Sequence, residues 1–231
     1  MLAKVFSSLL QYIMTGIAEN LQAIRERLRA APGVTLLAVT KGQSVERVRA
    51  AAAAGQSAFG ENYVQEALAK MPAAPGLEWH LIGPLQSNKT RAAAEHFDWV
   101  QTIDREKIAR RLSEQRPAAL APLNVLIQVN ASGEASKSGV APGEVERLAL
   151  AIQEMPRLRL RGLMAIPEPG APRERYKEAK ALFDRLGRRF SFDTLSIGMS
   201  EDMDTAIAEG STMVRIGTAI FGPREKAKSA A

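Results

Sequence analysis

The feature of this sequence that limits its fold most is an alternation, along nearly the whole chain, of short apolar segments with helical ones. The apolar segments have the length and β-branched content of buried strands, and they cover residues 35–40, 57–61, 78–82, 99–103, 124–129, 159–165, 194–197 and 213–216. Good helix formers with helical spacing occupy residues 45–54, 64–71, 89–96, 105–115, 145–154, 173–189 and 203–208. Strands that alternate with helices pair in parallel, and eight of them suit a closed sheet. The pattern therefore predicts an α/β fold, a single (β/α)8 barrel of the TIM type.

One domain with an additional leading helix accounts for the length of the chain. Its 231 residues lie within the range of a single barrel, and no low-complexity linker divides them. The leading helix is expected over residues 17–31, which Pro32 and Gly33 follow. We interpret residues 1–13 as a poorly defined N-terminal extension, with Met14 as an alternative start, and residues 14–231 as the barrel domain. The extension lacks the full pattern of a signal peptide, and no segment is apolar for long enough to cross a bilayer.

Composition excludes several chemistries. The sequence has no cysteine, which rules out disulfides, thiol catalysis and cysteine-bound zinc and is consistent with a cytoplasmic location. Its two histidines, His80 and His96, are too few for a histidine-rich metal site, and we expect no metal. The net charge of +6 favours an acidic ligand or nucleic acid. The basic residues, however, lie on predicted helix surfaces without interleaved aromatic residues, so we expect neither nucleic acid nor a membrane as a partner.

A lysine ends the first predicted strand. Residues 34–41 (Val-Thr-Leu-Leu-Ala-Val-Thr-Lys) form an apolar run that stops at Lys41, and Gly42 follows. Barrel enzymes keep their chemistry at this end of the strands, and burial there lowers the pKa of an amine toward the deprotonated form that a Schiff base requires. A solvated lysine at a strand end would fit the same pattern, so Lys41 alone does not decide its role.

Two glycine-bearing turns follow the last two predicted strands, at residues 196–200 (Ser-Ile-Gly-Met-Ser) and 215–218 (Arg-Ile-Gly-Thr). Gly198 and Gly217 have no Cβ, so backbone N–H groups can approach an anion closely, and Ser200 adds a hydroxyl donor. Barrels commonly bind phosphate after these two strands. Tight turns without a ligand also use glycine, and that alternative stays open.

The carboxylates of Glu201 and Asp202 favour a turn without a ligand, because they would have to point away from an anion. Even so, an amine at one end of the chain and a phosphate cradle at the other predict an aldehyde cofactor that carries a phosphate, which is pyridoxal 5′-phosphate (PLP).

Arg215 lies two residues before Gly217 and shares its strand face, which could point inward at the cofactor ring. An arginine only donates hydrogen bonds, so a ring nitrogen that meets it keeps its lone pair and the ring is a weaker electron sink. An ion pair at the barrel rim would explain Arg215 equally well.

Three further positions carry weaker signals. Residues 83–90 nearly match a nucleotide-binding P-loop, but Asn88 replaces its second glycine and Pro84 removes an N–H group. We therefore reject a nucleotide-dependent function. His80 is expected to be a core residue whose polar atoms are paired. Lys137, in the loop after the fifth predicted strand, is either a second amine for an anion or an ordinary loop lysine.

Taken together, these motifs resemble those of the pyridoxal phosphate homeostasis protein family, which is related in fold to the N-terminal barrel of alanine racemase. The matching stretches are residues 38–41, 60–66 (Gly-Glu-Asn-Tyr-Val-Gln-Glu), 80–89 (His-Leu-Ile-Gly-Pro-Leu-Gln-Ser-Asn-Lys), 128–130, 137–139, 162–164, 196–200 and 215–217. The stretches at 60–66 and 80–89 are highly specific to the family. After the lysine motif the family usually has a proline, where this sequence has residues 42–44 (Gly-Gln-Ser).

The resemblance implies that Lys41 carries PLP as an internal aldimine and that Arg215 meets the ring nitrogen. It places Asn62 near the ring, and it adds to the cofactor-binding set Met199 and, at the phosphate, Ser200, Gly217 and Thr218. It further implies a PLP-binding protein that buffers or delivers the cofactor in vitamin B6 homeostasis, with no catalytic residues and no substantial turnover of its own. We expect a cytoplasmic monomer whose partners, besides PLP, are apo PLP-dependent enzymes.

An amino-acid racemase or another PLP-dependent enzyme is the alternative. Racemisation needs a base on each face of the substrate carbanion, and Lys41 supplies one face. A racemase of this fold type takes the other base, a tyrosine, from an additional β-domain of a partner subunit. We expect that domain to be absent because the sequence ends at the barrel, and we therefore favour a carrier.

Overall fold

The computed structural model describes the backbone of residues 2–130 and 138–223 and, within these ranges, the side chains from residue 15 onward. Eight strands pair in parallel in their order along the chain: β1 (Thr35–Val39), β2 (Ala58–Glu61), β3 (Glu78–Leu81), β4 (Trp99–Ile103), β5 (Leu123–Val129), β6 (Leu158–Ala165), β7 (Thr194–Ser196) and β8 (Met213–Ile216). β1 also pairs with β8, with Leu37 opposite Arg215, so the sheet closes into a barrel. This confirms the predicted (β/α)8 fold.

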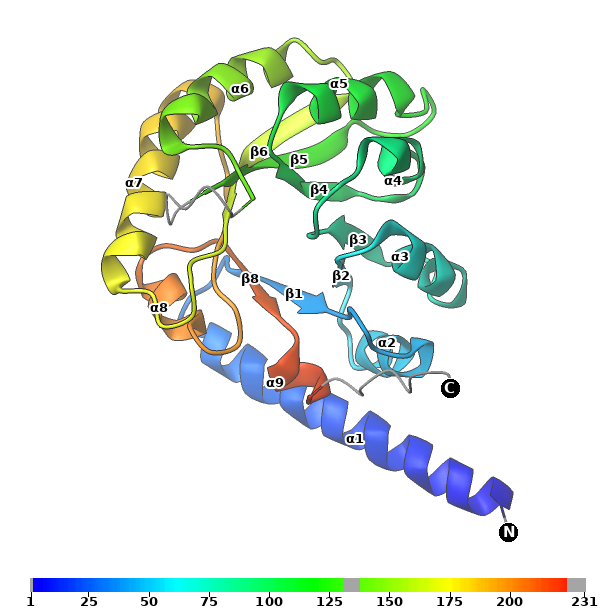
Figure 1. Ribbon diagram of the computed structural model, residues 1–231. Helices are drawn as coiled ribbons and strands as arrows, with labels where there is room; N and C mark the ends of the chain where they lie inside the picture. Colours follow the sequence, from blue (N-terminus) through cyan, green and yellow to red (C-terminus); the bar gives the residue numbers. More distant parts are fainter. Residues whose placement is uncertain (1, 131–137, 224–231) are drawn as a thin grey trace, which may run out of the picture.

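Helices cover the outside of the barrel (Figure 1). They are α2 (Val45–Ala53), α3 (Val64–Lys70), α4 (Thr90–His96), α5 (Glu106–Gln115), α6 (Val145–Gln153), α7 (Arg173–Phe190), α8 (Met203–Ala208) and the short α9 (Thr218–Phe221). From α2 to α8, each helix begins and ends within one residue of its predicted bounds. The agreement follows from amphipathic patterning, as in α5, where Ile108, Ala109 and Leu112 form the buried face.

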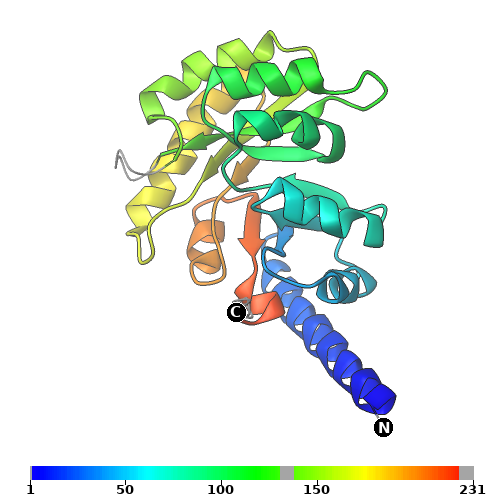
Figure 2. The ribbon, with the colours of Figure 1, turned by 45° about the vertical axis from the view of Figure 1, so that its right-hand side comes forward.

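The leading helix α1 (Leu2–Leu28) differs from the prediction at both ends. It begins at Leu2, and no proline interrupts residues 2–28, so the backbone of residues 2–13 continues the leading helix. It ends before Ala31 because a proline disfavours helical geometry in the residue that precedes it. Both ribbon views show the N-terminal part of α1 running out beyond the barrel (Figures 1 and 2). In the described part of the chain, no helix is long and apolar enough to cross a membrane.

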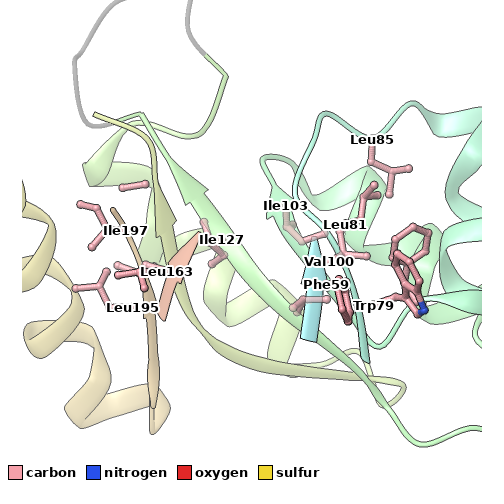
Figure 3. Packing of buried hydrophobic residues seen from close by; sticks show 14 of the residues in the cluster. Phe59, Trp79, Leu81, Leu85, Val100, Ile103, Ile127, Leu163, Leu195 and Ile197 are labelled. Carbon is pink, nitrogen blue, oxygen red and sulfur yellow. The ribbon is translucent and has the colours of Figure 1, made fainter. Parts of the chain in front are cut away.

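The strand side chains form two layers, because successive residues of a strand point to opposite faces. The outward-facing layer packs with the helices in one large apolar cluster that includes Phe59, Leu81 and Val100 (Figure 3). The inward-facing layer contains two smaller apolar clusters, Leu37, Val39, Ala58, Ile82 and Met213 in one and Trp99, Leu126 and Met164 in the other. The same inward-facing positions also hold buried polar side chains, namely His80, Gln101, Ser196 and Arg215. The interior of this barrel is therefore partly polar.

Candidate cofactor site

A cavity of about 360 Å³ lies at the carboxyl ends of the strands. Its wall contains all seven residues predicted to bind the cofactor, which are Lys41, Asn62, Met199, Ser200, Arg215, Gly217 and Thr218. Barrel closure explains how residues from both ends of the sequence meet here. Because β1 and β8 are hydrogen-bonded neighbours, the loop after β1 lies next to the turn after β8.

Lys41 reaches this cavity because side chains alternate along a strand. Leu37 and Val39 of β1 belong to an inward-facing cluster, and Lys41 continues that face just past the end of the strand. The next residue, Gly42, has a φ of 69°, a left-handed conformation that glycine adopts without steric cost. The N–H of Gln43 then closes the turn by donating to the last carbonyl before the lysine, at 2.9 Å. The loop therefore turns sharply without the proline that is usual in the family.

A buried charge cluster that the sequence analysis missed holds the backbone on both sides of this lysine. Lys70 Nζ donates to the carbonyl oxygen of Thr40 (2.7 Å) and to Glu61 Oε1 (2.6 Å). Glu66 Oε1 accepts from Lys70 Nζ (2.7 Å) and from the N–H of Gly42 (2.5 Å). Burial raises the pKa of Glu61, against the opposite effect of its hydrogen bonds from Lys70 and Thr40. The available signal was the spacing of Glu66 and Lys70, four residues apart on one predicted helix.

The two glycine turns come together at the other side of the cavity. Gly198 has a φ of 104°, and a Cβ there would lie only 2.5 Å from the Cβ of Ala206, so the first turn requires glycine. In the second turn, the N–H of Ala219 points at Ser200 Oγ across 3.4 Å. The Ser200 hydroxyl of the first turn and the Ala219 N–H of the second therefore lie close together, and hydroxyl and backbone donors of this kind suit a phosphate.

Glu201 and Asp202, whose carboxylates favoured a turn without a ligand, lie differently in the structure. Asp202 Oδ1 accepts from the N–H of Met199 (2.5 Å), and Oδ2 accepts from the hydroxyl of Tyr176 (2.5 Å). Burial, together with this carboxylate, raises the pKa of Tyr176. Asp202 thus stabilises the turn through its own hydrogen bonds, whereas Glu201 is exposed. Both residues line the cavity.

Arg215 is buried inside the barrel and does not form the rim ion pair that was its alternative explanation. Its Nη1 donates to Ser196 Oγ (2.8 Å) and its Nη2 donates to the carbonyl oxygen of Ala165 (3.0 Å). Burial lowers the pKa of the guanidinium to about 10, so it remains charged at neutral pH. Within residues 15–130 and 138–223 it makes no salt bridge. A buried donor of fixed charge therefore lines the cavity.

The remaining sequence candidates lie elsewhere. His80 is fully buried and both its ring nitrogens are hydrogen-bonded, to Gln101 and Glu78, which confirms the expectation of a paired core residue. His96 is exposed on α4. Lys137 lies outside the described residues. Among the described residues, no group of acidic or histidine side chains could hold a metal ion.

The barrel, the amine after β1 and the glycine turns after β7 and β8 point to one class of protein, the barrels of the alanine racemase N-terminal type. The chain matches the sequence model of the alanine racemase N-terminal domain over residues 14–225. The pyridoxal phosphate homeostasis protein of Escherichia coli is 53% identical over 93% of this chain and 100% of its own length. The protein of that name from Pseudomonas aeruginosa is 55% identical over 92% of this chain and 97% of its own. The chain belongs to the pyridoxal phosphate homeostasis protein family.

Solved structures agree with this assignment. PipY from Synechococcus elongatus, solved without PLP, is 36% identical and superimposes with a TM-score of 0.83 over 89% of this chain and 100% of its own. PipY solved with PLP bound has a TM-score of 0.78 at the same coverage. Alanine racemase from Corynebacterium glutamicum shares the fold at 21% identity, with a TM-score of 0.71 over 93% of this chain and 62% of the racemase.

Proposed function

We propose that this protein binds PLP at the barrel mouth through Lys41, and that it buffers or delivers the cofactor in vitamin B6 homeostasis without substantial turnover of its own. The observation that carries the proposal is that one cavity joins the Lys41 amine, two glycine turns and the Arg215 guanidinium. Relatives more than half identical to this chain bear the name of pyridoxal phosphate homeostasis proteins, and PipY has been solved with PLP bound.

The side chains of the cavity suit three polar groups of PLP: the aldehyde, the phosphate and the ring nitrogen. When bound, PLP supplies an aldehyde that reacts with a lysine amine, and Lys41 is the lysine among the described residues of the wall. Ser200 and Thr218 offer hydroxyls to a phosphate, beside the backbone N–H groups of the turns. Arg215 offers N–H groups to the ring nitrogen. Because its pKa is about 10, it keeps its proton at neutral pH and does not transfer it to the ring.

The other predicted residues would surround the ring. Asn62 follows the end of β2, close to Lys41 in the barrel because β1 and β2 are paired neighbours. Met199 enters the wall from the turn after β7. We assign both to contacts with the ring and none of the seven residues to catalysis.

We further propose that residues 14–231 act as one cofactor-binding domain, and that the protein is a cytoplasmic monomer whose recipients are apo PLP-dependent enzymes. The match of the family model to residues 14–225 supports the domain. The absence of cysteine from the sequence is consistent with a reducing compartment.

Borohydride reduction of the PLP-loaded protein, followed by peptide mass mapping, tests the proposed link. The pyridoxyl group is expected on Lys41, and Lys41→Ala should lose the visible absorbance of bound PLP while phosphate contacts retain weak affinity. Lys89→Ala is the matched control, because Lys89 does not line the cavity, and it should behave as the wild type. A label found on Lys89 or Lys137 but absent from Lys41 would overturn the assignment.

A further inference from the structure

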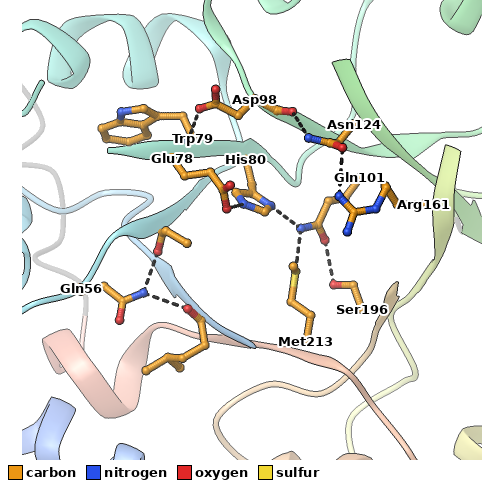
Figure 4. A network of polar contacts seen from close by, with 12 residues as sticks. Gln56, Glu78, Trp79, His80, Asp98, Gln101, Asn124, Arg161, Ser196 and Met213 are labelled. Carbon is orange, nitrogen blue, oxygen red and sulfur yellow. Dashed lines mark hydrogen bonds and ion pairs between the residues drawn. The ribbon is translucent and has the colours of Figure 1, made fainter. Parts of the chain in front are cut away.

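We propose that Glu78, at the end of the barrel opposite the cavity, is a remote positioning residue for Arg215 and thereby for the ring nitrogen of bound PLP. A row of buried hydrogen bonds through the barrel interior joins the two residues, and Figure 4 shows it from Glu78 to Ser196. The inference rests on the proposed function, because it needs a ring nitrogen for Arg215 to meet.

The row has four hydrogen bonds and crosses four strands. Arg215 Nη1 on β8 lies 2.8 Å from Ser196 Oγ on β7, and Ser196 Oγ lies 2.7 Å from Gln101 Oε1 on β4. Gln101 Nε2 lies 2.8 Å from His80 Nδ1 on β3, and His80 Nε2 lies 2.7 Å from Glu78 Oε1. The four inner side chains are buried, whereas the Glu78 side chain is 46% exposed at the amino end of β3. Solvent at one mouth of the barrel is thus connected to the cavity at the other.

The two ends of the row fix the direction of every bond. An arginine only donates, so Ser196 Oγ accepts from it and gives its own hydrogen to Gln101 Oε1. A carboxylate only accepts, so the proton of His80 lies on Nε2, and Nδ1 accepts from Gln101 Nε2. Burial lowers the pKa of His80, which keeps the ring in the neutral form that this order requires. All donors therefore point from Arg215 toward Glu78.

Apolar neighbours hold the middle of the row in place. The Trp99 ring stacks on His80 with 5.0 Å between ring centroids and 8° between planes. The second amide N–H of Gln101 donates to Met213 Sδ at 3.2 Å. Both N–H groups of this amide therefore have partners, and a rotation of the amide group would break both hydrogen bonds. Hydrogen bonds in such a buried chain polarise one another, so the loss of one weakens its neighbours.

The charges explain why the carboxylate matters at a distance. Arg215 is buried without a salt bridge in the described part of the chain, and its charge meets the negative ends of dipoles aligned toward Glu78. Dipoles aligned head to tail between opposite charges strengthen one another. Without Glu78, His80 loses its acceptor, and a proton moved to Nδ1 would oppose the N–H of Gln101. The order of the row, and with it the orientation of Arg215, would then be lost.

Binding of two probes tests the proposal: PLP itself and its 1-deaza analogue, in which carbon replaces the ring nitrogen. The wild type should prefer PLP, because the analogue has no lone pair for Arg215. Glu78→Ala should reduce this preference by roughly 2- to 30-fold, the range for mutations that change coupling between distant sites. Glu78→Gln keeps an acceptor for His80 but removes the charge, so it should restore part of the preference.

A matched control separates this role from a general loss of fold. Asp184 is 49% exposed and pairs with Lys180 at 2.5 Å on the outer helix α7, away from the row, so Asp184→Ala should keep the full preference. Equal loss of affinity for both probes in Glu78→Ala, or an unchanged preference, would overturn the inference alone. Failure of the wild type to bind PLP would overturn the proposed function and the inference with it.

A second measurement needs no variant. The ¹⁵N chemical shifts of the His80 ring in the ligand-free wild type at neutral pH should show a neutral ring protonated on Nε2. A ring protonated on Nδ1, or on both nitrogens, would contradict the direction of the row even if Glu78→Ala failed to fold.

Discussion

Lys70 and Glu61 form a buried ion pair, with 2.6 Å between Nζ and Oε1 and side chains that are 6% and 0% exposed. Lys70 also holds the carbonyl of the residue that precedes Lys41. Removing one partner leaves the other charge uncompensated in the interior, which costs far more than the loss of a surface pair. The pair therefore connects the stability of the barrel with the position of the proposed cofactor lysine.

Lys70→Met is expected to lower the free energy of unfolding by about 3–5 kcal/mol, measured by urea denaturation, because it leaves the buried Glu61 carboxylate without its charged partner. The double variant Glu61→Leu/Lys70→Met should recover most of that loss, since it removes both buried charges. Arg91→Ala is the control, because Arg91 pairs with Glu95 at the surface with 69% of its side chain exposed, and such pairs contribute less than about 1 kcal/mol. A single variant as stable as the wild type would show that the pair is not a structural necessity.

Ser200→Ala is expected to weaken PLP binding much more than the binding of pyridoxal, which has no phosphate. A hydrogen bond to a charged group contributes about 1.5–3 kcal/mol, so the loss for PLP should be roughly 10- to 150-fold. Ser57→Ala is the matched control, because Ser57 is exposed just before β2, at the other end of the barrel. Equal losses for the two ligands would count against Ser200 as a phosphate donor.

His80 should make stability depend on pH in a defined direction. Burial lowers its pKa in the folded protein, whereas in the unfolded chain it returns to about 6.5. Below that value the unfolded state binds a proton that the folded state excludes, so the free energy of unfolding should fall as the pH falls, by at most about 1.4 kcal/mol per pH unit.

Urea denaturation between about pH 7 and pH 5 would measure this slope, since the unfolded histidine titrates there. In His80→Phe the free energy of unfolding should change less steeply with pH than in the wild type, by up to about 1.4 kcal/mol per pH unit. Identical slopes for the wild type and His80→Phe would show that the buried ring does not control this dependence.

Amino acids should not be turned over by the PLP-loaded protein. Arg215 stays charged at neutral pH because its pKa is about 10, and it would leave the ring nitrogen unprotonated, which stabilises a carbanion poorly. Chiral analysis of L-alanine incubated with the holoprotein should show no racemisation at enzymatic rates, which are about 1–1000 per second. The protein should instead alter how fast an apo PLP-dependent enzyme is reconstituted.

Turnover at enzymatic rates would restore the racemase as the better interpretation. Arg215→Glu offers the converse test, because a carboxylic acid at the ring nitrogen would favour its protonation. That variant should show more side reaction with L-alanine than the wild type, provided that absorbance and thermal unfolding show a folded, loaded protein.

The sequence was sufficient for the architecture because each strand and helix carries its own local pattern. The apolar runs at β1 and β8 could be placed from their composition, and a closed barrel of eight strands then brings Lys41 and Gly217 to one mouth. That these residues bind PLP stays a prediction.

The polar interior could not be predicted in the same way. Gln101 and Ser196 are polar residues within apolar runs, and sequence alone gives no reason to pair them across the barrel. Their contact depends on the register of β4 and β7 around the closed sheet, which no local pattern encodes. The bounds of α1 were not predicted either, because no local signal marks its start at Leu2 and Pro32 limits its end only approximately.

The pairing of β1 with β8 has a consequence for the life of the protein in the cell. During synthesis, β1 leaves the ribosome long before β8, so the proposed site comes into existence only when the final strand of the barrel has docked. A ligand that binds only the closed form adds to its stability according to the ratio of free ligand to Kd. In a cell short of PLP, more of this protein would remain in the less stable, unliganded form. Its degradation by proteases would then increase as the supply of the vitamin falls.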